Sequence, residues 1–252
     1  MRSATIVILL AAGSQTTAAD AVRHFGPGGG FGDVPQLLDS VGIGRNNAGS
    51  ETTANSFRVP GQAGTTTDLT FSLVRDTGGF NFSFAYFDMA AVSADPLTNR
   101  NAFATQALAN AQLVFDDRTS NPGAVSSAFS VNAGSVLGFL IMPNSTIDAF
   151  NANPDAFLAD PNGVQNPRAP LFSMSDANPG QMDQMLSFVG NGVTLFTFED
   201  LVRTGDSDQD FTDVGFTIDV ELQGLEAPIV PTPTSAAMGV AGLGGLASRR
   251  RR

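Results

Sequence analysis

Two neighbouring runs of the chain alternate large apolar residues with small or polar ones. In residues 68–74 (DLTFSLV) Leu or Phe occupies every second position, and in residues 79–87 (GFNFSFAYF) Phe and Tyr do the same. A period of two places the apolar side chains on one face of an extended strand. Both runs therefore predict half-buried antiparallel strands, and Asp76-Thr77-Gly78-Gly79 between them predicts a hairpin.

Further short runs of the same kind follow along the chain. The clearest are residues 193–198 and 214–222, and the others are 113–115, 135–142, 171–174 and 186–189. Residues 101–112 are rich in Ala and lack Gly and Pro, so they are the best candidate for a helix. Many short strands with turn-rich connections predict an all-β fold, an antiparallel β-sandwich of jelly-roll or Ig-like type with one or two short helices.

The first 21 residues have the layout of a secretory signal peptide. Arg2 gives a basic start, an apolar run follows at 4–12 (ATIVILLAA), and Ala19-Asp20-Ala21 forms an A-x-A cleavage pattern. The apolar run is too short to span a bilayer as a helix of the mature protein. We therefore expect residues 1–21 to be removed on export; the alternative is an N-terminal strand of the core.

The other end of the chain has the layout of a sorting signal. Pro231-Thr232-Pro233 precedes a small-residue apolar run at 236–247 (AAMGVAGLGGLA), and the chain ends in four arginines at 249–252. The arginines would stay on the cytoplasmic side of a membrane, and the run is shorter than the ~20 residues that a stable span needs. The tail resembles the PEP-CTERM signal of Gram-negative-type bacteria, with Thr232 where that family usually has Glu. The resemblance implies an exosortase as partner, removal of the tail, transient membrane contact, and a place at the cell surface or in extracellular matrix.

The chain between these two ends is strongly acidic. Residues 22–230 contain eight arginines and twenty-three Asp or Glu residues, a net charge of −15, and the whole chain contains no cysteine. Such a surface attracts cations and repels phosphate backbones, which argues against nucleic-acid binding, including by the terminal arginines. Without disulfides, an exported domain must be stabilised by its core or by a bound metal.

The acidic residues are densest between the last two predicted strands. Asp206, Asp208, Asp210 and Asp213 have the D-x-D-x-D-x-x-D spacing of calcium loops, and Glu199 and Asp200 begin the same segment. Calcium accepts six to eight oxygen ligands in irregular geometry. No EF-hand is expected, because Phe211 and Thr217 stand at the sixth and twelfth positions from Asp206, where an EF-hand needs Gly and Glu. We predict a Ca²⁺ site formed by these six residues. The alternative is a solvated turn whose aspartates bind local backbone amides.

Catalytic chemistry has little support in this sequence. The only histidine is His24, close to the predicted cleavage site, and with no cysteine a zinc site lacks ligands. A Ser-His-Asp arrangement would depend on that one residue, and the acids between 199 and 226 contain no distinguished pair for glycoside hydrolysis. We therefore expect no enzyme, no catalytic residues and no organic cofactor, with a hydrolase as the least favoured alternative.

Three segments together resemble a family of exported bacterial domains. They are SVLGFLIM from Ser135, LFSMSDANPG from Leu171, and VTLFTFEDL from Val193, which is followed by the acidic segment and VGFTIDV. Through these segments, residues 68–222 resemble domain-of-unknown-function family 4114. Family members usually have Asn where this chain has Thr212. The resemblance implies a fold and a surface context but no reaction.

These observations divide the chain into five segments. We expect a signal peptide at 1–21, a Gly/Asn/Ser/Thr-rich segment at 22–67, a β-sandwich at 68–222, a linker at 223–230 and the sorting signal at 231–252. We predict an exported structural or adhesive domain that binds calcium and contacts extracellular polysaccharide. A calcium-dependent carbohydrate-binding module is the alternative, although the chain has no Trp, and its single Tyr86 alternates with phenylalanines expected in the core.

Overall fold

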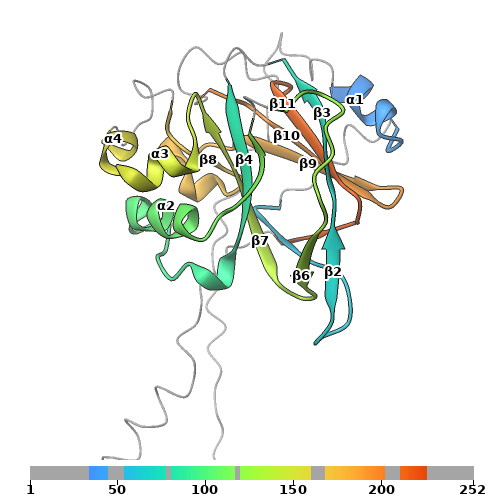
Figure 1. Ribbon diagram of the computed structural model, residues 1–252, viewed down its shortest axis with the longest axis horizontal. Helices are drawn as coiled ribbons and strands as arrows, with labels where there is room; N and C mark the ends of the chain where they lie inside the picture. Colours follow the sequence, from blue (N-terminus) through green and yellow to red (C-terminus); the bar gives the residue numbers. More distant parts are fainter. Residues whose placement is uncertain are drawn as a thin grey trace, which may run out of the picture.

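A computed structural model describes residues 34–44, 54–77, 81–116, 120–159, 168–201 and 211–225 (Figure 1). Within these residues the strands are antiparallel and form two larger sheets and one two-stranded ribbon. Side chains of both larger sheets share one apolar core. The expected all-β sandwich is therefore confirmed.

The larger sheet has the strand order β12-β1-β7-β4-β5, with β8 paired to β7. Its strands are β1 Ser56–Arg58, β4 Phe82–Asp88, β5 Gln112–Asp116, β7 Val136–Pro143, β8 Leu171–Phe172 and β12 Gln223–Leu225. Because β1 and β12 belong to this sheet, the sandwich extends beyond both expected boundaries, 68 and 222. The expected linker thus begins as a strand, since pairing with β1 satisfies its backbone.

The smaller sheet has the strand order β3-β11-β10-β9. Its strands are β3 Phe71–Asp76, β9 Met185–Gly190, β10 Val193–Phe198 and β11 Val214–Ile218, and the separate ribbon pairs β2 Thr66–Leu69 with β6 Phe129–Asn132. Strands β10 and β11 pair from Thr194 opposite Ile218 to Phe198 opposite Val214. The residues that follow Phe198 and those that precede Val214 therefore lie at the same end of this sheet.

The hairpin predicted between the first two alternating runs does not form. β3 pairs with β11 in the smaller sheet, whereas β4 pairs with β5 and β7 in the larger one. The two runs face each other across the sandwich instead, and the ring centroid of Phe71 lies 5.8 Å from that of Phe84 and 5.9 Å from that of Tyr86. Alternation identifies the face that each strand buries, but it does not identify the neighbouring strand.

Aromatic side chains fill the space between the two sheets. Phe84 of β4 contacts Phe216 of β11, with ring centroids 3.6 Å apart, and Phe57 of β1 meets Phe196 of β10 edge-on at 4.8 Å. Tyr86 is only 7% exposed, as its alternation with the phenylalanines predicts, and burial raises the pKa of its hydroxyl above the usual value. Pairs of this kind add roughly 0.5–1.5 kcal/mol each beyond the burial of their area.

Short helices cover the outer faces of both sheets (Figure 1). α2 Arg100–Ala109, α3 Ile147–Ala152 and α4 Asp155–Leu158 lie over the larger sheet, and α1 Val34–Ser40 lies over the smaller one. Three short 3₁₀-helices, η2 Met89–Ala91, η3 Ser175–Ala177 and η4 Pro179–Gln181, complete the helices of the described residues, which are more numerous than the one or two expected. None of these helices is long and apolar enough to cross a membrane.

The helical layer changes the environment of β4. Phe82, Phe84 and Tyr86 point into the core between the sheets, as predicted, but Ser83, Ala85 and Phe87 are buried as well. Ala85 and Phe87 pack in a second apolar cluster with Phe103 of α2. The expectation of a half-buried strand is therefore wrong for β4, because the helical layer packs on its second face.

One glycine of β7 shows how tightly this second cluster is packed. A Cβ at Gly138 would overlap Cζ of Phe87 and lie 2.8 Å from its Cε1. Crowding a packed core in this way costs about 1–3 kcal/mol. We expect Gly138→Ala to lower the free energy of unfolding by that amount in urea denaturation.

The matched control is Gly190→Ala in β9, where the added Cβ would lie 3.5 Å from Cγ2 of Ile43, an ordinary contact. This variant is expected to change the free energy of unfolding little. Equal losses in the two variants would contradict crowding against Phe87 as the cause.

Candidate metal centre

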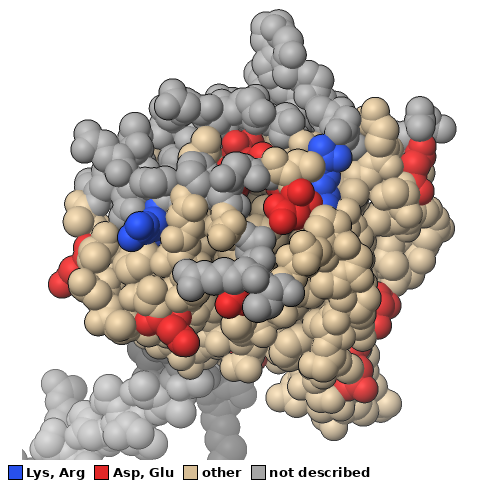
Figure 2. All heavy atoms as spheres, turned by 45° about the horizontal axis from the view of Figure 1, so that its top comes forward, with Lys and Arg blue, Asp and Glu red and all other residues tan. Residues whose placement is uncertain are grey.

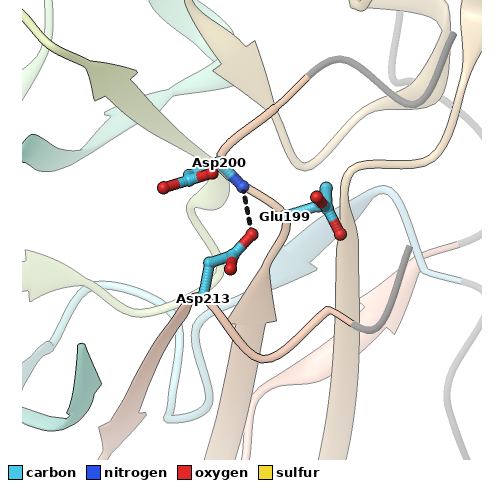
Figure 3. A group of neighbouring side chains, drawn as sticks. All are labelled: Glu199, Asp200 and Asp213. Atoms are coloured by element: carbon cyan, nitrogen blue, oxygen red, sulfur yellow. Dashed lines mark hydrogen bonds between the residues drawn. The ribbon is translucent and has the colours of Figure 1, made fainter. Parts of the chain in front are cut away.

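Three carboxylates meet where β10 ends and β11 begins. Glu199 and Asp200 directly follow β10, and Asp213 directly precedes β11. Because the last residue of β10 pairs with the first residue of β11, these positions are neighbours in space. One carboxylate oxygen from each of the three residues lies within 4.8 Å of the other two (Figure 3). Short-range strand pairing thus brings the three acids together.

The three carboxylates are largely removed from water. Glu199 is 1% exposed and Asp200 is 3% exposed, while Asp213 is half-buried. Ionised carboxylates that are close together in such a place repel one another unless a cation or hydrogen-bond donors compensate for their charge. On the face drawn in Figure 2, acidic side chains are scattered, with arginine side chains among them. Either kind of compensation is possible in such a place, a bound cation or donors of the protein itself.

Backbone hydrogen bonds fix the orientation of the acids. The amide of Asp200 donates to Oδ2 of Asp213 at 3.0 Å, and the amide of Phe211 reaches Oε2 of Glu199 at 3.5 Å. The amide of Glu199 donates to the main-chain oxygen of Gln184 at 3.0 Å, which ties the segment to the start of β9. The carboxylates are therefore held by the ends of three adjacent strands.

The backbone of Phe211 and Thr212, just before β11, is held by contacts with α1 and β3. Phe211 has a φ of 56°, and its side chain is buried in a cluster with Leu37 and Leu38 of α1. The main-chain oxygen of Thr212 accepts from Nε of Arg75 and from Oγ1 of Thr77, both at 2.9 Å. A left-handed backbone at a bulky residue costs roughly 1–2 kcal/mol, which these contacts offset. The position of Asp213 is thus determined by packing against β3 and α1.

A buried amide beside the acids has an oxygen without a donor in the described parts of the chain. Gln184 is fully buried, and its Nε2 donates to the main-chain oxygen of Leu201 at 3.0 Å. Among the described residues, no donor reaches Oε1 of Gln184. A carbonyl oxygen is a common ligand of hard cations, so this amide adds one candidate oxygen to the turn that carries Glu199 and Asp200.

Three of the six predicted ligands, Glu199, Asp200 and Asp213, are brought together. Asp206, Asp208 and Asp210 fall in residues 202–210, outside the described residues. Gln184 was missed by sequence reasoning, because a single Gln fifteen positions before Glu199 belongs to no spacing motif. Its place could have been found, because Asn191-Gly192 between the predicted strands at 186–189 and 193–198 is typical of a hairpin, and this hairpin brings residue 184 beside residue 199.

Fold and geometry together define a class: an antiparallel β-sandwich domain with a candidate centre for a hard cation at the end of one hairpin. Residues 131–221 match the family model described as Domain of unknown function (DUF4114). This match contains Gln184 and all three acids, and it begins later than residue 68, where the resemblance was expected to start. No curated protein and no solved structure matches the chain.

A second group of acids lies on the helical side of the larger sheet. Burial raises the pKa of Asp176 above its ordinary value of 3.8, and the negative charges of Asp95 and Asp183 raise it further. The folded protein therefore binds this proton more tightly than the unfolded chain does. The stabilisation that results is fully present below pH 3.8 and is lost as the pH rises through the pKa of the folded state.

At pH 7, ionised Asp176 opposes folding, so we expect Asp176→Asn to raise the unfolding midpoint. The difference between variant and wild type should shrink as the pH is lowered through the pKa of Asp176, because the wild-type side chain then becomes neutral as well. Thermal melts over this pH range provide the measurement, and Asp155→Asn, at an exposed position of α4, is the charge-matched control. A lower midpoint for Asp176→Asn at pH 7 would contradict the raised pKa.

Proposed function

We propose that the protein is an exported structural or adhesive domain of a bacterial cell surface or extracellular matrix, stabilised by a calcium ion at the β10–β11 end. The observation that carries the calcium proposal is the convergence of Glu199, Asp200 and Asp213 within 4.8 Å. Asp206, Asp208 and Asp210 are proposed to complete the ligand set. An exosortase-type enzyme and extracellular polysaccharide are the proposed partners.

Oxygen ligands alone select a hard cation. Calcium accepts six to eight oxygens at irregular angles, whereas magnesium requires a near-octahedral arrangement and usually keeps several waters. At this centre, two carboxylates already accept backbone hydrogen bonds, which limits how far they can turn. Carboxylates that cannot turn freely suit calcium, which tolerates irregular angles, better than magnesium.

Burial of the acids supports a structural role for the ion. With Glu199 and Asp200 almost fully buried, an ion bound to them would lie beneath the protein surface and crosslink two strand ends. Exposed aromatic rings, on which sugars stack, have no counterpart in the described residues, where the exposed large hydrophobic side chains are Leu97, Leu113 and Val125. A structural domain is therefore favoured over a carbohydrate-binding module.

Calcium is expected to raise the thermal midpoint of the wild-type protein relative to the same protein in EDTA. An ion that binds only the folded state adds about 2.7 kcal/mol at one hundred times its dissociation constant. Asp213→Asn, and separately Asp208→Asn with Asp210→Asn, should lose most of this rise. Asp148→Asn, at an exposed position of α3, removes the same charge elsewhere and should retain the rise.

Two results would count against this site. If calcium leaves the wild-type midpoint unchanged, the acidic segment is only a solvated turn. If wild type, Asp213→Asn and the double variant all rise equally, calcium binds at another place.

Export predicts a mature protein that is shorter at both ends. Residues 1–21 and the segment after about Pro233 should be absent from protein recovered from the cell surface. Cleavage removes the signal peptide, and the apolar tail is too short to be a good permanent anchor. Intact-mass spectrometry of the native protein measures both ends. Arg252 on the surface form would contradict tail removal, and a cytoplasmic protein that keeps residues 1–21 would contradict export.

A further inference from the structure

We infer that Gln184 is a ligand of the ion through its side-chain Oε1, and that this neutral oxygen makes the centre selective for calcium over magnesium. The inference rests on the proposed calcium site and adds a residue from a third strand end. Three acids alone would suit several divalent ions. A mixed set of carboxylate and amide oxygens is typical of calcium.

Gln184 is attached to the residues on both sides of Asp200. Its main-chain oxygen accepts from the amide of Glu199 at 3.0 Å, and its Nε2 donates to the main-chain oxygen of Leu201, also at 3.0 Å. The side chain therefore spans the turn that carries two of the three acids. Because Oε1 and Nε2 share one carbon atom, Oε1 is confined to the immediate neighbourhood of this turn.

The hydrogen bond to Leu201 also determines which end of the Gln184 amide is Nε2 and which is Oε1. A flipped amide would place Oε1 against the main-chain oxygen of Leu201, and two acceptors would then face each other. Nε2 must therefore face Leu201, and Oε1 must face elsewhere. Since Gln184 is fully buried, Oε1 lies inside the protein, where no donor from the described residues reaches it.

A buried carbonyl oxygen that lacks a donor is costly, and each such group in a native protein calls for a physical reason. Next to Glu199 and Asp200, a bound cation provides that reason, because it pairs with the amide oxygen and with the carboxylates at once. Main-chain and amide carbonyls are regular members of calcium sites. Magnesium more often binds one or two carboxylates and keeps its waters.

The test is calorimetric titration of the full-length protein with CaCl₂ and with MgCl₂. Gln184→Leu removes both polar atoms at similar volume and is expected to weaken calcium binding by about tenfold or more, since even supporting residues of metal sites cost that much. Ser56→Ala is the control. Oγ of Ser56 is also buried without a partner among the described residues, but it lies on β1 in the other sheet, so this variant should keep the wild-type affinity.

Gln184→Glu provides a second variant that keeps an oxygen at the same place. Because it brings four carboxylates together, this variant should have a lower thermal midpoint than wild type in EDTA. Calcium should then raise its thermal midpoint by more than it raises that of wild type. A rise equal to that of wild type would overturn the assignment of Gln184 as a ligand.

The remaining outcomes separate this inference from the proposed function. Gln184 is only a packing residue if Gln184→Leu binds calcium as well as wild type does. In that case its thermal midpoint would be lowered by the same amount in EDTA and in calcium. Equal wild-type affinity for calcium and magnesium would overturn the selectivity. If wild type binds no calcium, the proposed function fails, and this inference fails with it.

Discussion

Contact between the aromatic faces of the two sheets is the interaction on which the other described elements of this molecule depend. The chain contains no cysteine, so no disulfide supplements the core. Phe84 and Phe216 lie against each other at its centre, and Phe198 stacks on Phe216 at 5.8 Å. The larger sheet can bury its outer face beneath α2 and α3 only because its inner face is already held in this way. Burial of large rings is thus the main source of stability, as expected for a domain without disulfides.

The same contact prepares the candidate metal centre. Phe198 is the last residue of β10 and is fully buried in the aromatic core, so the acids begin one residue beyond it. On the other strand, Asp213 is followed by Val214, which is also buried in that core. An ion would therefore bind to backbone that the core has already ordered. For Glu199, Asp200 and Asp213, little conformational entropy would be lost on binding, which is the general advantage of pre-organised ligands.

The sequence predicted local features of this fold better than it predicted the partners of each strand. Alternation correctly placed Phe84 and Tyr86 in the core, because the period of side chains along a strand is a local property. It could not show that β3 and β4 belong to different sheets, since the pairing of β3 with β11 joins residues far apart in the chain. The strands β1 and β12 were missed as parts of the sandwich for the same reason.

In the candidate site, residue spacing revealed only part of the arrangement. Glu199, Asp200 and Asp213 could be predicted together because they flank two strands that follow each other and pair. β9 also directly precedes β10 and pairs with it, so the place of Gln184 beside Glu199 was equally local, but a lone Gln carries no ligand motif. The helices over β4 were also hidden, since Ser83 and Ala85 are compatible with either water or a close helix.

The pairing of β1 with β12 has a consequence for the order in which the molecule folds. Ser56 lies opposite Leu225, so one of the first strands of the chain needs one of the last to complete its sheet. A chain that emerges in order from a ribosome or a translocation pore leaves one edge of β1 open until Leu225 has appeared. Contacts this distant in sequence form slowly, because a long loop must close first. The topology thus delays completion of the larger sheet until nearly the whole domain is available, which is compatible with passage through a narrow pore as an unfolded chain.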